Sequence, residues 1–297
     1  MNSELKRLTN ELKNRKFLDL LNESWESHSS QINLITQLLT YLETGYASKI
    51  KPLVKVGNEL FRQIIIENSC MKGNVLESIL KMIKRDREGD TIDRALLKNV
   101  LRMLTELQLY DQFEVFFLEE TKKHYEQESR EKIEKINLPE YLQYVEIKRT
   151  LETERVLHYL DNRTKKPLLQ LTEQEVIQVH VEELLIKGFD ELMEENNLLQ
   201  LSLLFTLFSK VAQTEPINLS FGTYCKRVGL ELVNDQQKED SLILQLLQLK
   251  SKLSTILEQS FQSHPSFKES LRVSPQLFFF FFINLHFFLN RGPLFIL

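Results

Sequence analysis

The sequence predicts an all-α protein, and three observations support this. Glycine (8) and proline (7) are scarce among the 297 residues. These residues form many of the turns that a fold of short strands would need. Apolar residues recur at spacings of three and four through most of the chain, which indicates helices with one buried face. No stretch shows the sustained apolar–polar alternation of a half-buried strand. We therefore expect helices joined by short loops.

The chain is too long for one simple helical bundle. Its length suits two domains or an extended array. A dozen or so helices can each bury a face on the next, so we expect stacked helical units that form an elongated α-solenoid. No short fixed period is present, so any repeat is long and divergent.

Two helices are expected in the first 50 residues. The first spans residues 3–25, and Ser29 or Ser30 caps the second, which ends near Gly45. The second helix places several apolar residues on one side, which we expect to be its buried side. These residues are Ile32, Ile35, Leu38, Leu39 and Leu42.

Three further helices are expected before residue 105. Pro52 occupies the first turn of one helix, whose apolar residues are Val56, Leu60, Phe61, Ile64 and Ile65. Asn74 and Glu77 resemble a capping pair at the start of the next helix, which Gly89 ends. The third helix covers residues 96–104.

Residues 106–129 carry an aromatic stripe. Its members are spaced three and four apart and share one helical face, so we expect a buried core rather than a cofactor site. They are Tyr110, Phe113, Phe116, Phe117, Thr121 and Tyr125.

The second half of the chain continues the helical pattern. Asn137 and Pro139 begin a helix, a polar break covers residues 162–167, and Thr172 with Glu175 form a capping box. Gly188 marks a kink or a stop. Residues 198–211 are apolar nearly all round, which predicts a central helix. A helix opening at Pro216 and one spanning residues 242–261 complete the set.

Composition and motifs offer no catalytic or metal site. The formal net charge of −4 disfavours a nucleic-acid-binding body. The six histidines lack metal-ligand spacing, and no phosphate loop or nucleophile elbow is present, so we expect no cofactor. Cys225, beside Lys226 and Arg227, is either a low-pKa thiol or an ordinary helical residue. The two cysteines and the polar N-terminus favour the cytoplasm and nucleus.

Four segments resemble the cullin family, the scaffolds of ubiquitin ligases. Residues 85–104 follow the family order R-x-G-x-x-I-D-R-x-L-L, and residues 109–125 follow LY-x-x-F-E-x-x-F-L-E-x-T-x-x-x-Y. Residues 137–145 with Glu152, Glu154, Arg155, Tyr159 and Leu160 resemble the helix that follows. Residues 19–46 are similar to the last helices of the first cullin repeat. The resemblance covers nearly all of residues 16–274, and the matching residues are most similar to those of the fourth cullin class.

The resemblance implies a fold of stacked five-helix cullin repeats. Residues 1–50 would form a partial first repeat, 51–162 the second, 163–274 an incomplete third, and 275–297 an aberrant Phe-rich tail. The implied function is a non-catalytic scaffold arm in a cullin-RING ubiquitin ligase, whose rigid helices fix the distance between substrate and ubiquitin carrier. The alternative is a generic α-solenoid that tethers other proteins through a lateral face.

Three departures from the family pattern are expected to matter. The opening helices of the first repeat, the end of the third and the C-terminal half are not recognisable. That half holds the RING-protein cradle and the modifier lysine in the family. The tail after Ser274 contains eight phenylalanines. We interpret it as a shifted reading frame or retained intron, with a membrane anchor as the alternative, because Asn284, Arg291 and Pro293 are costly or disruptive in lipid.

The resemblance also implies a partner. Family members bind a substrate-receptor adaptor, of the propeller type in the fourth class, through the second and fifth helices of the first repeat. Residues 29–48 resemble the fifth, so Gln37, Tyr41, Glu43 and Tyr46 are the candidate partner-binding residues. Tyr46 is the first choice as an aromatic anchor, and the alternative is that it packs under the Pro52 turn. No RING protein, nucleic acid or membrane is expected as a partner.

Overall fold

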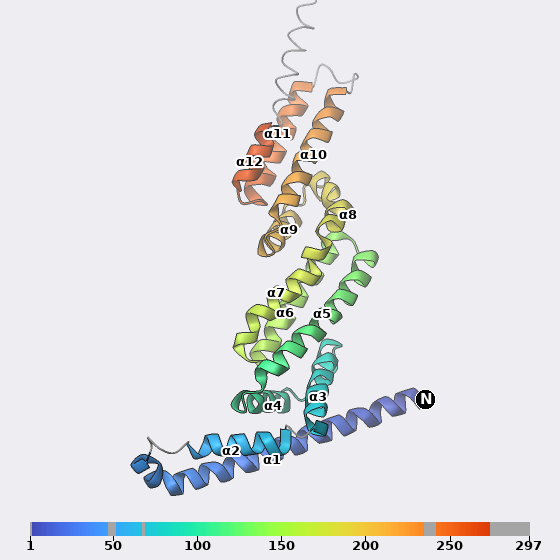
Figure 1. Cartoon of the computed structure of the whole chain (residues 1–297). Coiled ribbons are helices and arrows are strands. Elements are labelled where there is room, and N and C mark those ends of the chain that lie inside the picture. Colours follow the sequence, from blue (N-terminus) through green and yellow to red (C-terminus); the bar gives the residue numbers. More distant parts are fainter. Residues whose placement is uncertain (1, 47–51, 67–68, 235–241, 274–297) are drawn as a thin grey trace, which may run out of the picture. The chain divides into compact units, whose positions relative to one another are not determined.

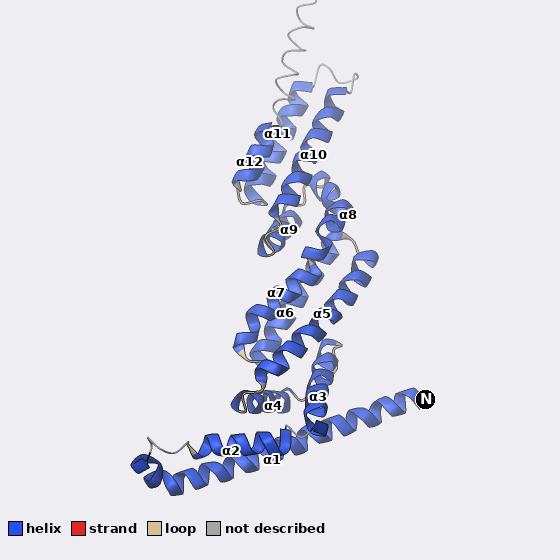
Figure 2. Ribbon diagram, viewed as in Figure 1, coloured by secondary structure: helices blue, strands red, loops and turns tan. Residues whose placement is uncertain are grey.

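The computed structural model describes residues 2–46, 52–66, 69–234 and 242–273, and it omits the side chains of 2–15, 40–46, 65–66, 69–72, 233–234 and 272–273. Every regular element in these ranges is helical, so the all-α prediction is confirmed (Figure 2). The chain divides into two compact units. Residues 1–124 and 150–171 form the first, and residues 125–149 and 172–297 form the second.

The first unit contains α1 (Asn2–Tyr46), α2 (Leu53–Phe61), α3 (Ser69–Arg87) and α4 (Arg94–Glu106). It also holds the N-terminal half of α5 (Tyr110–Lys135), the C-terminal part of α6 (Leu138–His158) and most of α7 (Lys165–Val176). A π-helical segment, Arg62–Ile66, follows α2 directly. Figure 1 shows α2 lying along α1, and α4 also contacts α1.

The core of the first unit is built around the aromatic stripe of α5. Tyr110, Phe113 and Phe117 are buried there, and the rings of Phe113 and Phe117 stack with centroids 5.6 Å apart. Trp25 and Phe61 join the same core from α1 and α2, with ring centroids 5.1 Å apart. The stripe prediction is therefore confirmed, with one exception. Phe116 is 47% exposed, because it lies at the edge of the stripe beside exposed Val115.

The second unit contains α8 (Val181–Glu194), α9 (Leu198–Lys210), α10 (Thr214–Asn234), α11 (Leu242–Gln259) and α12 (Pro265–Val273). The C-terminal half of α5, the N-terminal part of α6 and the last residues of α7 complete it. Phe205, Phe208, Phe221, Phe261 and Phe267 form the aromatic centre of its core. The prediction of a buried helix near residues 198–211 is confirmed, except that Leu199 is exposed.

Several predicted helix boundaries are wrong. Residues 26–30 are helical, so α1 is one helix rather than two, and neither Ser29 nor Ser30 is a cap. No glycine or proline interrupts this stretch, and serine alone does not break a helix. Asn74 lies inside α3. Thr172 and Glu175 lie inside α7 and are buried, so neither pair caps a helix start. The polar break ends at Thr164, because Lys165 already belongs to α7.

Other boundary predictions are confirmed. Gly89 follows α3 with a φ of +91°, a conformation that favours glycine. Asn137 and Glu140 form a reciprocal capping box before α6: the Glu140 amide donates to Asn137 Oδ1 at 2.9 Å, and the Asn137 amide donates to the Glu140 carboxylate at 3.3 Å.

Gly188 does not end α8, which continues to Glu194. A Cβ added at Gly188 would lie 2.8 Å from the Leu138 Cβ, so the glycine allows α6 to approach α8 closely. This close approach is a packing requirement, and it explains why a glycine occurs in the middle of a helix.

Candidate interaction surface

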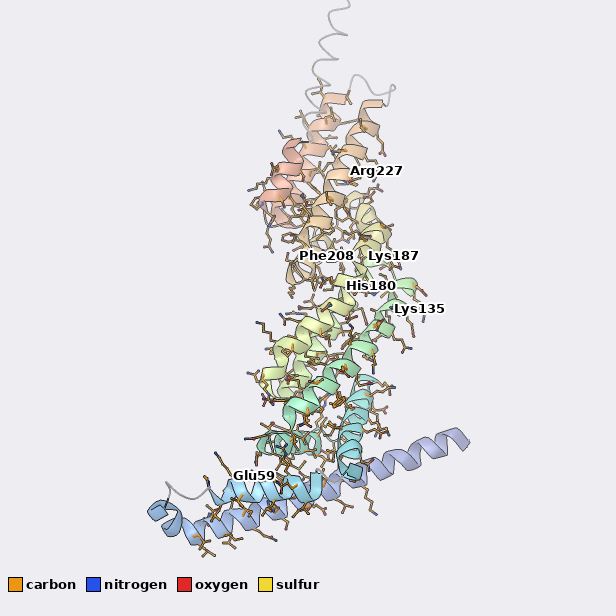
Figure 3. The ribbon with its side chains drawn as sticks, viewed as in Figure 1. Glu59, Lys135, His180, Lys187, Phe208 and Arg227 are labelled. Carbon is orange, nitrogen blue, oxygen red and sulfur yellow. The ribbon has the colours of Figure 1, made fainter. Side chains whose placement is uncertain are left out.

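Cys225 and His180 are both buried in the second unit. Cys225 is buried, and burial raises the pKa of its thiol to about 12, which identifies it as an inert core residue. Among the described residues, no group of three or more His, Cys, Asp or Glu side chains is placed to hold a metal ion. His180 contacts Ser129 with its Nε2 3.0 Å from the hydroxyl, and Lys187 donates to the carbonyl of Ile133 (Figure 3). These interactions tie α8 to α5.

One buried cluster of charged side chains lies in the first unit. Arg155 Nε donates to Asp86 Oδ2 at 2.8 Å, and Arg155 Nη1 lies 3.2 Å from Glu152. Arg87 Nε donates to the same Glu152 carboxylate at 3.0 Å, and its Nη2 donates to Thr121 at 2.8 Å. All four charged side chains are at most 6% exposed.

The charged groups of this cluster hold helices together, and we call Asp86, Arg87, Glu152 and Arg155 the Asp86–Arg155 clasp. Burial alone would raise the pKa of Asp86, but hydrogen bonds from Arg94 and Arg155, together with their charges, hold the pKa of that carboxyl below its usual value. Burial raises the pKa of Tyr159, whose hydroxyl donates to Asp86 at 3.2 Å. The cluster joins α3, α5 and α6 and brings together Arg87, Glu152, Arg155 and Tyr159, which the family resemblance had singled out. Its acidic and basic groups are paired with one another and hydrogen-bonded, as buried charges in a protein core usually are.

The second feature is an exposed apolar surface on α1. Residues 27–42 contain no Asp, Glu, Lys or Arg, although 27% of the chain is charged. Leu38 is 75% exposed and Leu34 is 58% exposed, and Ile35 and Leu39 are also exposed. The prediction that Ile35, Leu38 and Leu39 are buried is therefore wrong, because no described part of the chain covers them. Ile32 is half-buried beneath Gly57, and the side chain of Leu42 lies outside the described residues.

The exposed surface begins in a groove between α1 and α2. The groove has a volume of about 360 Å³ and is lined by Ser24, Ser27, His28 and Gln31 on one side and by Leu60, Phe61 and Ile64 on the other. His28 Nε2 donates to the Gly57 carbonyl at 3.1 Å, and its ring lies against Phe61 with centroids 4.9 Å apart. These contacts fix the groove floor. Leu60 and Ile64, predicted as core residues, are exposed on its wall.

The predicted partner-binding residues all lie on the last part of α1. Gln37 is exposed. The side chains of Tyr41, Glu43 and Tyr46 lie outside the described residues, so the structure does not test their exposure. Helical periodicity predicts neither the groove nor the exposure of Leu34, Leu38 and Ile64. The absence of charge over residues 27–42 was the available signal, since an apolar surface without charged neighbours is typical of an interface core.

The family model described as the cullin α-solenoid domain matches residues 1–284. The chain is 34% identical over 272 residues to Cullin-4 of Dictyostelium discoideum, and 33% identical over 267 residues to Cullin-4A of Homo sapiens. These alignments cover 90% and 88% of this chain but 33% and 35% of the relatives. Cullin-3 of Dictyostelium discoideum is 31% identical over 288 residues, which are 91% of this chain and 37% of that protein. The chain thus spans about a third of the length of these curated relatives. No helix in the described residues meets the length and hydropathy required to cross a bilayer.

Proposed function

This chain belongs to the cullin family, and from that premise we propose that it is a non-catalytic scaffold arm of a ubiquitin ligase. In this proposal α1 docks a substrate-receptor adaptor of the propeller type, and the chain works in the cytoplasm and nucleus. The repeat boundaries belong to the same proposal: residues 1–50, 51–162 and 163–274 correspond to the first, second and third cullin repeats.

The observation that carries the proposal is the exposed, uncharged surface of α1. A helix that exposes Leu34, Ile35 and Leu38 leaves apolar area in water, and covering that area is favourable by roughly 25 cal/mol per Å². Exposed contiguous apolar patches of this kind typically mark interaction sites. The segment that resembles the adaptor-docking helix is also the segment in which Leu34, Ile35, Leu38 and Leu39 are exposed close together.

The rest of the described chain supports a scaffold rather than an enzyme. Its buried polar groups are used to lock helices together, as in the Asp86–Arg155 clasp, and its buried thiol has a raised pKa. A scaffold needs such rigidity, because its contribution is to hold two partners at a fixed separation. No RING protein, nucleic acid or membrane enters the proposal as a partner.

Isothermal titration calorimetry with a purified propeller adaptor tests the proposal. We expect a dissociation constant in the micromolar range, since one helix end offers less than the ~800 Å² per partner of a standard interface. Tyr46→Ala and Gln37→Glu should each weaken binding by about tenfold or more, because both alter the proposed docking face. Phe116→Ala, at an exposed aromatic on α5, is the matched control and should leave the affinity unchanged.

Two results would count against the adaptor site. Adaptor binding would be rejected if no heat of binding and no competition with a full-length cullin were measured at adaptor concentrations on the order of 100 μM. This concentration is well above the expected dissociation constant. Binding that is indifferent to both Gln37→Glu and Tyr46→Ala would place the docking site elsewhere on the chain.

A further inference from the structure

The groove and the exposed leucines of α1 form one continuous face. Ser24, Ser27, Gln31, Leu34, Ile35 and Leu38 follow the three- and four-residue spacing of a single helical side. The stripe from Ser24 to Leu38 extends over about 21 Å of helix axis at 1.5 Å per residue. Leu60 and Ile64 widen its first part into the groove of about 360 Å³. We call this surface the α1 stripe.

We propose that the α1 stripe is the interface between two copies of this chain, paired through α1 in antiparallel orientation. A two-fold interface brings one patch against the same patch on the other copy, so any charge within it meets its own like charge. The α1 stripe avoids this repulsion, since it contains no Asp, Glu, Lys or Arg. The acidic residues next to it in sequence, Glu23, Glu26 and Glu59, are exposed and remain able to face solvent. Arg62, between Leu60 and Ile64, donates to the Leu107 carbonyl at 3.5 Å.

The available area matches what a dimer requires. The exposed parts of Leu34, Ile35, Leu38, Leu60 and Ile64 amount to on the order of 500 Å² of apolar surface per copy. Standard interfaces cover ~800 Å² per partner and are roughly 56–65% apolar, which corresponds to about 450–520 Å². Ser24, Ser27 and Gln31 supply uncharged polar surface for the remainder, and their side chains can hydrogen-bond across the axis.

The helical geometry also fits self-pairing. Leu34, Ile35 and Leu38 project from α1 like the knobs of a helix–helix interface, and the hollow between Gln31 and Ile64 offers a recess for them. In an antiparallel pair centred near Gln31, Leu38 of one copy reaches the groove end of the other. Each copy then fills the other's groove, which closes the assembly at two members.

This inference goes beyond the proposed adaptor function, and both are argued from the exposed Leu34, Ile35 and Leu38 of α1. Gln37 and Tyr46 lie along the same helix. Adaptor and second copy should therefore exclude each other.

Sedimentation equilibrium of the full chain alone tests the inference. We expect a reversible monomer–dimer equilibrium with a micromolar constant, and Leu38→Glu should raise the dissociation constant by about a hundredfold or more, since two buried charges are introduced per dimer. Leu157→Glu is the matched control, because Leu157 is 72% exposed on α6 and lies outside the α1 stripe. The control should associate like the unaltered chain. Circular dichroism melts should show equal stability for both variants, since both positions are exposed.

Three outcomes would overturn the inference. The first is an unaltered chain that stays monomeric at concentrations on the order of 100 μM, well above the expected constant. The second is a Leu38→Glu variant that still associates, which would place self-association elsewhere. The third is an equal loss of association in Leu157→Glu. If the unaltered chain is monomeric and Leu38→Glu abolishes adaptor binding, the α1 stripe belongs to the adaptor alone.

Discussion

Phe113 and Phe116 lie three residues apart on α5, and truncating them should have different effects on stability. Phe113 is fully buried against Tyr110 and Phe117, whereas Phe116 is 47% exposed. We expect Phe113→Ala to lower the free energy of unfolding by about 3–5 kcal/mol through the cavity it leaves. Phe116→Ala should cost less than about 1 kcal/mol. Denaturant melts of both variants measure this difference, and equal losses would show that the stripe is misassigned.

The Asp86–Arg155 clasp predicts a large effect of truncating one partner. Arg155→Ala removes one of two arginine partners from both Asp86 and Glu152, which keep Arg94 and Arg87, so we expect a loss of about 1.5–3 kcal/mol in unfolding free energy, the range for hydrogen bonds to charged groups. Arg102→Ala is the control, because its ion pair with Glu106 lies on the surface and is worth less than about 1 kcal/mol. A clasp variant as stable as the control would mean that the cluster contributes nothing to folding.

Asp86 also predicts a dependence of stability on pH. Its pKa is lowered in the folded state, so its carboxylate contributes stability above the unfolded pKa of about 3.9, and this contribution is lost as pH falls through the folded value. Unfolding free energy measured from pH 6 to pH 2 should therefore fall below about pH 4. Asp86→Asn should lower the stability at pH 6 and reduce this fall. If the unfolding free energy of Asp86→Asn fell as steeply with pH as that of the unaltered chain, Asp86 would not be the source of the pH dependence.

At the scale of the element, the contact between α6 and α8 depends on Gly188. A Cβ there would clash with the Leu138 Cβ, which cannot move without its backbone. Gly188→Ala should thus destabilise the chain by about 1–3 kcal/mol. Gly229→Ala in α10 is the control, since nothing lies within 4 Å of its added Cβ, and it should be neutral or stabilising by up to about 1 kcal/mol. Thermal melts showing equal effects would remove the packing explanation for Gly188.

The sequence predicted helix type well and helix boundaries less well. Periodicity located the aromatic stripe of α5 and the buried α9, because spacing depends on local geometry alone. The Thr172–Glu175 pair was misread as a cap, since the same residue pattern fits a helix interior when tertiary contacts bury it. The sequence also did not predict that α1 continues through Ser29 and Ser30, because serine often caps a helix but also occurs inside helices.

The exposure of the α1 stripe could not be predicted from spacing. Ile35 and Leu38 recur as core residues do, and periodicity shows that a face needs covering but not which chain covers it. Arg87, Glu152 and Arg155 match the family motifs, and the sequence assigned them no role. Their role as a buried clasp became evident only in three dimensions, because the three residues lie on two helices far apart in sequence.

For the whole molecule, the proposal predicts no ubiquitin transfer by this chain alone. With purified ubiquitin, activating and carrier enzymes and a RING protein, we expect no RING-dependent conjugation above background. The chain should instead reduce conjugation by a full-length cullin when added in excess, because both would compete for one adaptor. The Tyr46→Ala variant should inhibit less. RING-dependent transfer by the chain itself would contradict its assignment as a non-catalytic arm.

Hydrogen–deuterium exchange of the full chain, with and without the propeller adaptor, tests the central claim most directly. Docking on α1 predicts slower amide exchange over residues 27–46 on adding adaptor, since bound helices open less often. Exchange in α8 and α9 should be unchanged. Protection confined to other helices, or identical exchange at saturating adaptor, would contradict a docking site on α1.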